Sequence, residues 1–182
     1  TMIKTKKTFF ALSTPTGVSA TATIRISGPK SPKILKEITK KKIGFFKTNK
    51  ATYTSIYNKN NTLVDKCVIV YYRKPRSYTG EHLIEVNTHG NPNIIQNLFA
   101  VLGDLGVKIA KPGEFTKTAY KNNKIDLVQA EAVYNLINSQ TTQGINISLN
   151  NLEGKLSNEF SKIRNNLKLA LSMVEYELDI SE

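Results

Sequence analysis

Alternation of hydrophobic and polar residues predicts strands in the first two thirds of the chain. Within the segment ATATIRISG every second residue is apolar, and this period places Arg25 on the polar face of a strand over 20–27. A second alternating segment, over 82–88, places Glu85 and Asn87 on one face of its strand. Further strands are predicted over 8–12, 51–58, 63–72 and 107–110.

Helical patterns separate some of these strands. A Lys-rich amphipathic segment over 30–41 predicts the first helix. A second helix is predicted to begin with Asn91 as its N-cap and Pro92 at its first helical position, and to end before Gly106. We therefore expect an α+β fold with a mixed sheet and packed helices over residues 1–119.

The pattern becomes helical after residue 120. One helix is predicted over 126–139, and a second over about 143–179 would be roughly 55 Å long at 1.5 Å per residue. Only Gly154 weakens the interior of this long helix. Its single apolar stripe needs partner helices. We therefore expect a second subunit, or a part of the protein outside these 182 residues, to cover much of the stripe.

The composition, with 40% hydrophobic and 22% charged residues, is that of an ordinary globular protein. The single cysteine, Cys67, excludes an internal disulfide and is expected in the core, and one cysteine with two histidines forms no metal-ligand cluster. No segment approaches the roughly 20 apolar residues that span a bilayer, and the N-terminus is not a convincing signal peptide. The chain is therefore expected to be cytoplasmic, with no membrane contact and no metal site.

The positive charge is concentrated near the N-terminus. Residues 1–50 hold 11 Lys and one Arg against a single acid, Glu37, which accounts for +11 of the net charge of +12. Such asymmetry is compatible with a surface that faces RNA or another polyanion. It is equally compatible with a general bias toward lysine, because only four of the basic residues are Arg. The charge alone does not decide between these interpretations.

The segment KNNKID contains the pattern Asn123-Lys124-x-Asp126, with which GTP-binding proteins recognise guanine. A guanine site also needs a phosphate-binding loop of the type Gly-x-x-x-x-Gly-Lys-Ser/Thr. The only Gly-Lys pair is Gly154-Lys155, and Leu156 follows it. The motif is also predicted to open a helix, which is the wrong context. We conclude that the segment is not a guanine site.

Four longer stretches together resemble the tRNA modification GTPase family MnmE or TrmE, also called ThdF. They are STPTG with TIRISGPK (13–30), PRSYTGEHLIEVNTHG (75–90), AKPGEFTKTAYKNNKIDLVQAEAV (110–133), and LEGKLSNEF with VEYELDISE (152–182). The resemblance covers nearly the whole chain. It implies a tetrahydrofolate-binding and dimerisation domain over 1–119, and the first half of a helical domain over 120–182.

The resemblance further implies a fold similar to the folate-binding part of glycine-cleavage aminomethyltransferases. In this family a GTPase domain, which uses GTP, Mg²⁺ and K⁺, is inserted after about this point. The full protein is implied to be a GTP hydrolase that works as a homodimer with the FAD-dependent partner MnmG/GidA. Together they modify C5 of the wobble uridine of tRNA to carboxymethylaminomethyluridine. The carbon is implied to come from 5-formyl- or 5,10-methylene-tetrahydrofolate, and the present chain alone is not expected to be catalytic.

Three folate-binding positions carry over by motif: Arg25 of TIRISG, Glu85 of TGEHLIE and Lys124 of NNKIDL. Physical chemistry agrees, because a carboxylate accepts the two adjacent N–H groups of a pterin edge, and cations suit its carbonyl and the glutamate tail. Each residue also has a simpler interpretation. Arg25 and Glu85 are each compatible with an ordinary ion pair, and Lys124 with a solvated lysine at a helix start.

Two segments depart from the family pattern. Val18-Ser19-Ala20 stands where the family usually has a glycine-rich segment, and Asn91 follows His89-Gly90 where a second glycine is usual. Loss of glycine restricts the backbone and the approach of a ligand. His89 lies on the Glu85 face if the strand extends that far, although a role in stabilising its loop is the stronger expectation.

Other functions compete with the folate hypothesis. The first alternative is a basic tRNA-docking module without a functional folate site, whose RNA binding would weaken steeply with salt. A stand-alone folate-dependent aminomethyl transferase lacks a second catalytic domain and an acid–base pair. A purely structural dimerisation domain would not need Arg25, Glu85 and Lys124 together.

Overall fold

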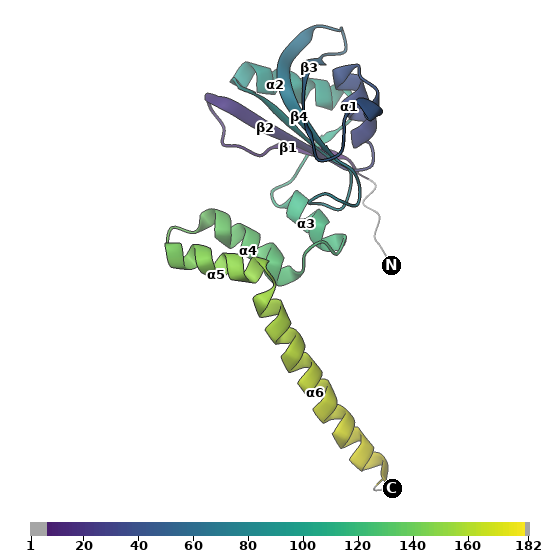
Figure 1. Ribbon diagram of the computed structural model, residues 1–182, viewed down its shortest axis with the longest axis vertical. Coiled ribbons are helices and arrows are strands. Elements are labelled where there is room, and N and C mark those ends of the chain that lie inside the picture. The colour runs from purple at the N-terminus through teal and green to yellow at the C-terminus, as the bar shows by residue number, and fades with distance from the viewer. Residues whose placement is uncertain (1–6, 181–182) are drawn as a thin grey trace. The chain divides into compact units, whose positions relative to one another are not determined.

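The computed structural model describes residues 7–180 of the chain (Figure 1). Residues 1–6 and 181–182, which include Lys4 and Lys6 of the basic N-terminal segment, lie outside the described residues. The chain divides into two compact units, of which the first ends at Lys124 and the second begins at Ile125. The boundary predicted after residue 119 falls within helix α3 (Glu114–Lys121).

A six-stranded sheet in the order β3-β4-β5-β2-β1-β6 forms the first unit. Among residues 7–180, only β1 and β6 pair in parallel, and the four other strand pairings are antiparallel. The mixed α+β fold predicted from the sequence is therefore confirmed. The strands are β1 (Phe9–Leu12), β2 (Ser19–Ser27), β3 (Ala51–Tyr57), β4 (Leu63–Tyr72), β5 (Leu83–Gly90) and β6 (Lys108–Ile109).

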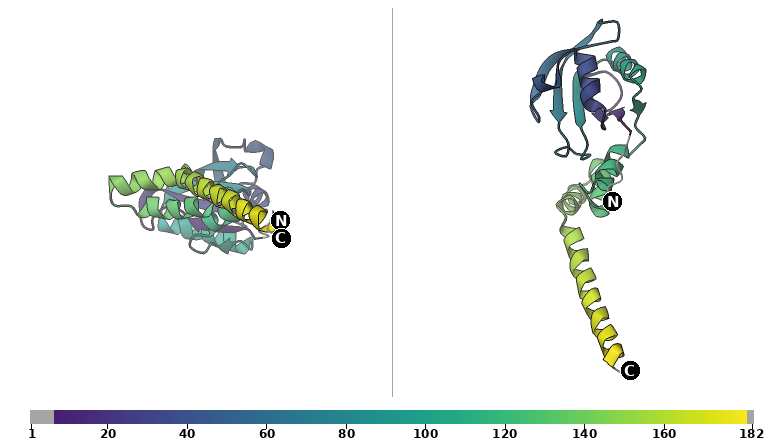
Figure 2. Two further views of the ribbon diagram at one scale, coloured as in Figure 1. Left: turned by 90° about the horizontal axis from the view of Figure 1, so that it is seen from below. Right: turned by 90° about the vertical axis from the view of Figure 1, so that its right-hand side faces the viewer.

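Helices α1 (Ser31–Thr39) and α2 (Pro92–Asp104) lie on the same side of the sheet (Figure 2). The core is the layer between these helices and the sheet, and its side chains come from alternate strand positions, as the period of two requires. Ile24 and Ile26 of β2 contribute to it together with Leu35 of α1 and Leu102 of α2, and all four are fully buried. The opposite face of the sheet consequently carries the polar residues of the same strands.

The ends of α2 follow the sequence signals. Asn91 is the N-cap, and its side chain accepts a hydrogen bond of 2.8 Å from the N–H of Asn93. Pro92 is the first helical residue, and Gly106, with φ of +72°, adopts the left-handed conformation just after the helix. The departure from the family pattern at Asn91 therefore has a local structural role, because the side chain satisfies a backbone donor that a glycine would leave free.

Cys67 of β4 belongs to the core, as its apolar surroundings in the sequence predicted. Burial raises the pKa of its thiol to about 12, and the nearby carboxylate of Asp65 contributes to the increase. At neutral pH the thiol is therefore protonated, and Cys67 behaves as a small apolar residue.

The described part of the second unit, residues 125–180, contains three helices: α4 (Leu127–Asn138), α5 (Thr142–Leu152) and α6 (Lys155–Ile180). The prediction of one continuous helix over 143–179 was wrong, because the chain breaks at Gly154, where φ is +83°. The Gln129 side chain on α4 donates a hydrogen bond of 2.8 Å to the carbonyl of Leu152 and so satisfies one of the last carbonyls of α5. A glycine at the break permits the left-handed backbone.

Helix α6 exposes its apolar residues. Phe160, Ile163 and Leu167 are each more than half exposed, and the pattern continues through Leu171 and Val174 to Leu178. No helix within residues 7–180, including the long α6, is both long and apolar enough to cross a bilayer. Its stripe is the kind of surface that packs against further helices.

The core position of Leu35 gives a test of the packing. We expect Leu35→Ala to lower the free energy of unfolding by about 2–5 kcal/mol, because the substitution leaves a cavity beneath the sheet. Leu63→Ala removes the same atoms from a side chain that is 49% exposed, and we expect a change within about 0.5 kcal/mol. Urea denaturation followed by circular dichroism measures both. Equal losses of unfolding free energy in the two variants would contradict the placement of Leu35 in the core.

Candidate functional site

A row of polar side chains crosses the centre of the sheet on the face opposite α1 and α2. It forms because β2 and β5 pair in antiparallel register, with Arg25 directly opposite Glu85 and Thr23 directly opposite Asn87. Tyr72 of β4 joins the row from the other side of β5. Neighbouring side chains on these strands, such as Ile24 and Val86, point into the core.

Arg25 and Glu85 form a close ion pair at the centre of this row. Nε of Arg25 donates to Oε1 of Glu85 at 2.7 Å, and the hydroxyl of Tyr72 donates to Oε2 at 3.0 Å. The Glu85 side chain is only 18% exposed, whereas that of Arg25 is 41% exposed. Each carboxylate oxygen thus accepts one hydrogen bond from the protein, and a carboxylate has about four acceptor positions in all. Glu85 can therefore accept two further donors.

Tyr72 holds the carboxylate in place from the side opposite Arg25. Burial raises the pKa of its phenol, and the negative charge of Glu85 and the hydrogen bond to it raise the pKa further, while Arg25 acts in the opposite direction. The phenol is therefore protonated throughout the neutral range and remains a donor to Glu85. The two donors together fix the orientation of the carboxylate plane.

Asn87 and Thr23 extend the row along the same two strands. The Thr23 hydroxyl donates to Oδ1 of Asn87 at 2.7 Å, and Nδ2 of Asn87 donates to the carbonyl of Val68 at 3.3 Å. The amide group of Asn87 is thereby oriented by two partners. The row therefore presents an oriented, uncharged amide group beside the Arg25–Glu85 pair.

Lys124 lies beside the loop between β4 and β5. A Cβ atom at Gly80 would lie 3.1 Å from Cγ of Lys124, so the lysine stem packs directly on this glycine, whose φ is +74°. Nδ2 of Asn122 donates to the carbonyl of Thr79 at 2.7 Å, and the Thr79 and Ser27 hydroxyls are hydrogen-bonded at 2.7 Å. These contacts attach the segment before Lys124 to the loop and to the end of β2. A glycine suits this position, because a side chain would be strained at this positive φ and its Cβ would crowd Lys124 and Asn122.

The structure therefore joins two of the three predicted residues directly. Arg25 and Glu85 contact each other, whereas no hydrogen bond or ion pair among residues 7–180 links Lys124 to either of them. The Lys124 side chain is exposed and has no acidic partner in that range. Tyr72 was missed by the sequence analysis. Only the register of β4 against β5 shows that the second tyrosine of CVIVYY faces Glu85 and not the core.

His89 has the structural role that was the stronger expectation. Its Nδ1 lies 2.9 Å from Oδ1 of Asp65, and its backbone N–H donates to Oδ2 of the same carboxylate at 2.9 Å. These contacts join the end of β5 to the start of β4. A second histidine, His82, lies 2.7 Å from the hydroxyl of Tyr71, and burial lowers the pKa of its imidazole. Both histidines thus stabilise strand ends.

The residues of the Asn123-Lys124-x-Asp126 pattern have local structural roles. Asp126 is the N-cap of α4, where its carboxylate accepts the N–H of Gln129 at 2.8 Å and the Gln129 side chain accepts the N–H of Asp126 at 3.0 Å. This reciprocal pair is a capping box. Asn123 adopts a left-handed turn with φ of +54°. The Asp126 carboxylate is therefore occupied by its own helix.

Each of the two units matches a domain of a known protein family. Residues 8–124 match the family model described as "GTP-binding protein TrmE N-terminus", and residues 127–182 match "MnmE helical domain". These two matches define the class, a protein with the N-terminal and helical domains of tRNA modification GTPases.

Curated relatives support the same assignment. Three of these relatives are each named "tRNA modification GTPase MnmE". The protein of Fervidobacterium nodosum is 37% identical over 97% of this chain and 39% of its own length. The protein of Thermosipho melanesiensis is 41% identical to this chain, and that of Aquifex aeolicus is 38% identical. Each of these two alignments covers 94% of this chain and 38% of the relative's length. The chain belongs to the MnmE family, and it spans about two fifths of the length of these relatives.

The contact between Tyr72 and Glu85 gives a pH-dependent test. We expect ultraviolet titration at alkaline pH, taken as the difference between the unmodified chain and Tyr72→Phe, to show a phenol that ionises above the ordinary pKa of 10.0. Glu85→Gln should lower this pKa. Because the folded-state pKa is raised, the stabilisation by Tyr72 is complete below pH 10 and is lost as pH rises through the higher value. An unchanged pKa in Glu85→Gln would contradict the contact.

Proposed function

We propose that this chain is the tetrahydrofolate-binding, homodimer-forming N-terminal part of a tRNA modification GTPase. The observation that carries the proposal is the Arg25–Glu85 pair on the polar face of the sheet, with Tyr72 as its third member. The family assignment supports it, because both units match the family models. The proposed ligand is 5-formyl- or 5,10-methylene-tetrahydrofolate, which supplies a one-carbon unit when bound.

The donor and acceptor groups of the site fit a pterin. Glu85 is held by Arg25 and Tyr72 and keeps an acceptor position on each oxygen, which suits two adjacent N–H donors. Arg25 uses Nε for the ion pair, so that its terminal nitrogens can donate to a carbonyl or carboxylate oxygen. Because the protein orients these groups before a ligand arrives, binding costs little side-chain ordering.

Lys124 is assigned to the negatively charged part of the ligand. It has no acidic partner within residues 7–180, and its stem is positioned by contact with Gly80. An ammonium group is a flexible point charge, which suits the carboxylates of a glutamate tail better than the fixed edge of a ring. The exposed position of Lys124 is compatible with a tail that extends toward solvent.

A second subunit is proposed to complete the site. Arg25, Glu85 and Tyr72 lie on a sheet face that α1 and α2 do not cover, and small-ligand sites usually bury most of their ligand. Two cavities in the described part of the unit are lined by other residues. A homodimer formed through this unit would provide the missing wall.

The parent protein is proposed to hydrolyse GTP and to act with the FAD-dependent partner MnmG/GidA on C5 of the wobble uridine of tRNA. Within this reaction, which leads to the carboxymethylaminomethyl group, the present chain has a binding role. Arg25, Glu85 and Lys124 hold and orient the folate, and the hydrogen bond from Tyr72 keeps the Glu85 carboxylate in position. We assign no catalytic residue to this chain, and we place it in the cytoplasm.

Calorimetric titration of the chain with 5-formyltetrahydrofolate tests the proposal. We expect saturable binding that weakens at least about tenfold in Arg25→Ala and in Glu85→Gln, because hydrogen bonds to charged groups contribute about 1.5–3 kcal/mol. Lys124→Ala should weaken binding less than these two substitutions do. Its effect should be larger for a folate that carries several glutamates. Sedimentation of the same samples should show a dimer.

Matched substitutions in the second unit serve as controls. Arg164→Ala and Glu131→Gln remove the same charges from exposed helix positions, and both should bind folate like the unmodified chain. Absence of binding by a folded, dimeric chain would overturn the folate proposal. Equal losses in the site and control variants would show that net charge, and not the site, governs binding.

A further inference from the structure

The Asn87 side chain lies two residues beyond Glu85 on β5 and is held from both sides of its strand. Its register partners are Thr23 on β2 and Val68 on β4, the two strands that flank β5. The Thr23 hydroxyl donates to Oδ1 of Asn87, and Nδ2 of Asn87 donates to the Val68 carbonyl. One contact toward each neighbouring strand thus fixes the plane of the amide.

Each of these contacts uses only part of what the amide offers. An amide oxygen has two acceptor positions, and an amide nitrogen has two N–H donors. Within residues 7–180 the Asn87 side chain makes no hydrogen bond besides the two to Thr23 and Val68. One acceptor and one donor are therefore left over. Because the two partners lie on opposite sides of β5, the amide edge between Oδ1 and Nδ2 remains open to a ligand.

Apolar side chains adjoin Asn87 and Glu85 on the same face of the sheet. Val70 is the register partner of Glu85 and Val68 that of Asn87, and cross-strand partners share a face. Both valines are partly buried, whereas Ile69 between them is fully buried in the core. An apolar floor with a few oriented polar groups is typical of small-ligand sites. A flat ring that rests on the valines can meet both polar side chains with its edge.

We propose that Asn87 recognises the amino end of the pterin ring of the folate. In a pterin the exocyclic NH₂ group lies between a ring N–H and a ring nitrogen that accepts hydrogen bonds. Glu85 accepts the ring N–H and one N–H of the amino group. The second N–H and the neighbouring ring nitrogen form a donor–acceptor pair, which an amide binds with two hydrogen bonds, as Asn does at the edge of adenine. This assignment rests on the proposed function and adds the residue that reads this edge.

The order of the residues along β5 sets the direction of the ligand. Asn87 and Glu85 are about 7 Å apart along the strand, at 3.3–3.4 Å per residue, so their side chains can flank one NH₂ group. Lys124 packs on Gly80, which precedes β5, and it therefore lies toward the other end of the row. With the amino end of the ring at Asn87, the glutamate tail extends toward Lys124. This direction agrees with the role proposed for Lys124.

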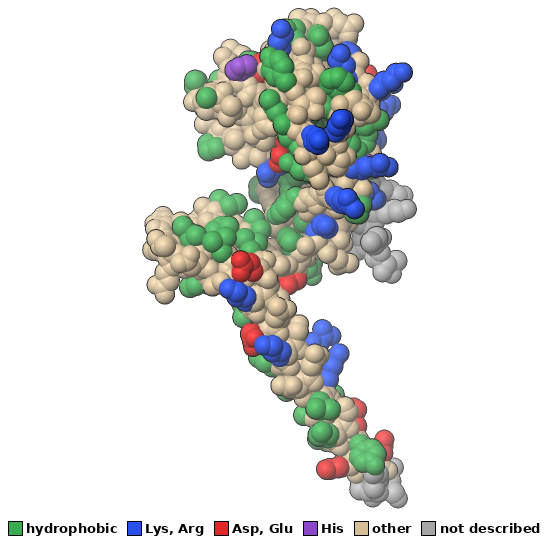
Figure 3. Space-filling view, viewed as in Figure 1, with side chains coloured by type: hydrophobic (Ala, Val, Ile, Leu, Met, Phe, Trp, Pro, Cys, Tyr) green, Lys and Arg blue, Asp and Glu red, His purple; other side chains and the backbone are tan. Residues whose placement is uncertain are grey.

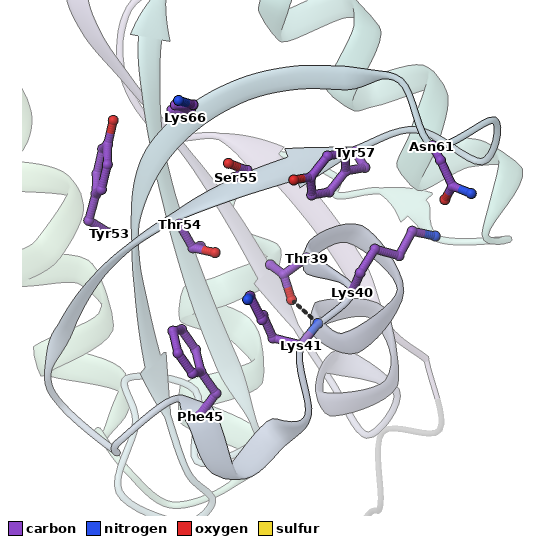
Figure 4. A pocket seen from close by; sticks show the side chains of 10 residues that line it. All are labelled: Thr39, Lys40, Lys41, Phe45, Tyr53, Thr54, Ser55, Tyr57, Asn61 and Lys66. Carbon is purple, nitrogen blue, oxygen red and sulfur yellow. Dashed lines mark hydrogen bonds between the residues drawn. The ribbon is translucent and has the colours of Figure 1, made fainter.

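Charge by itself does not distinguish a pterin from other anions at this unit. The face of the first unit shown in Figure 3 carries many Lys and Arg side chains and few Asp or Glu, which attracts any ligand with carboxylates. The cavity of about 480 Å³ beside β3, shown in Figure 4, shares no lining residue with the row and does not take part in reading the ring. Discrimination between rings therefore depends on oriented, uncharged groups such as the Asn87 amide.

Calorimetric titration of the full chain with two ligands tests the role of Asn87. The ligands are 5-formyltetrahydrofolate and its analogue with a methyl group on the 2-amino nitrogen, which keeps one N–H for Glu85 and blocks the other. We expect the unmodified chain to bind the analogue at least about tenfold more weakly, because both hydrogen bonds to Asn87 are lost. Asn87→Ala should weaken binding of 5-formyltetrahydrofolate about tenfold and should bind the two ligands within about threefold of each other.

Thr23 supplies a second pair of variants, which act through the orientation of the amide. Thr23→Val removes the donor to Oδ1 with little change in side-chain size, and it should reduce the preference for 5-formyltetrahydrofolate over the analogue about threefold. Thr23→Ser keeps the hydroxyl and should restore the preference. A purely structural role of the amide would not depend on the amino group of the ligand. If thermal melting shows that Asn87→Ala does not fold, the two Thr23 variants decide.

The matched control is Asn97→Ala, which removes the same group from an exposed position on α2, on the other side of the sheet. It should leave both affinities unchanged, and Glu85→Gln should weaken both by the same factor. The loss in Asn87→Ala should also be equal for folates with one and with several glutamates. A loss that grows with the number of glutamates would place the tail, and not the amino end, at Asn87 and would refute the assignment.

The same titrations separate this assignment from the proposed function. Equal weakening of both ligands in Asn87→Ala, or the absence of a preference in the unmodified chain, would refute the role of Asn87 and leave the folate site in place. Absence of binding of 5-formyltetrahydrofolate by the folded, dimeric chain would overturn the proposed function and the assignment of Asn87 with it.

Discussion

The antiparallel pairing of β2 with β5 at the centre of the sheet is the constraint on which the rest of the first unit depends. In this register Ile24 lies opposite Val86 and Ile26 opposite Ile84, which builds the core, while Arg25 lies opposite Glu85 on the other face. A shift of one residue would place the ion pair in the core and the isoleucines in solvent. The burial of the apolar face therefore fixes the position of the polar pair.

The proposed site at the centre of the sheet is ordered by hydrogen bonds within the protein. At the sheet centre, Arg25 and Tyr72 satisfy one acceptor position on each Glu85 oxygen, so the site is ordered and nearly neutral before a ligand binds. An ordered site of this kind favours discrimination between ligands by hydrogen bonding.

In the second unit, side-chain contacts fix where α4 begins and where α5 ends. The capping box of Asp126 and Gln129 starts α4, and the same glutamine side chain reaches the end of α5. The apolar stripe of α6 then remains exposed, and the chain spans about two fifths of the relatives that it matches. The stripe is thus an exposed apolar surface of the kind that packs against other helices.

Local patterns in the sequence were sufficient for the elements and for the faces of their residues. Period-two alternation placed Arg25 and Glu85 on polar faces, and the Asn91-Pro92 signal located the start of α2. Both depend on interactions within a few residues. Family resemblance, resting on longer motifs, indicated the class that the comparisons show.

Only the tertiary structure decided which of these residues meet. The Arg25–Glu85 contact joins residues 60 positions apart, and the contact of Tyr72 with Glu85 depends on the register of a third strand. The break at Gly154 likewise involves Gln129 from another helix, so the continuous apolar period concealed it. Strand register and helix packing are long-range properties, and they are set by the burial of the whole core and not by any one segment.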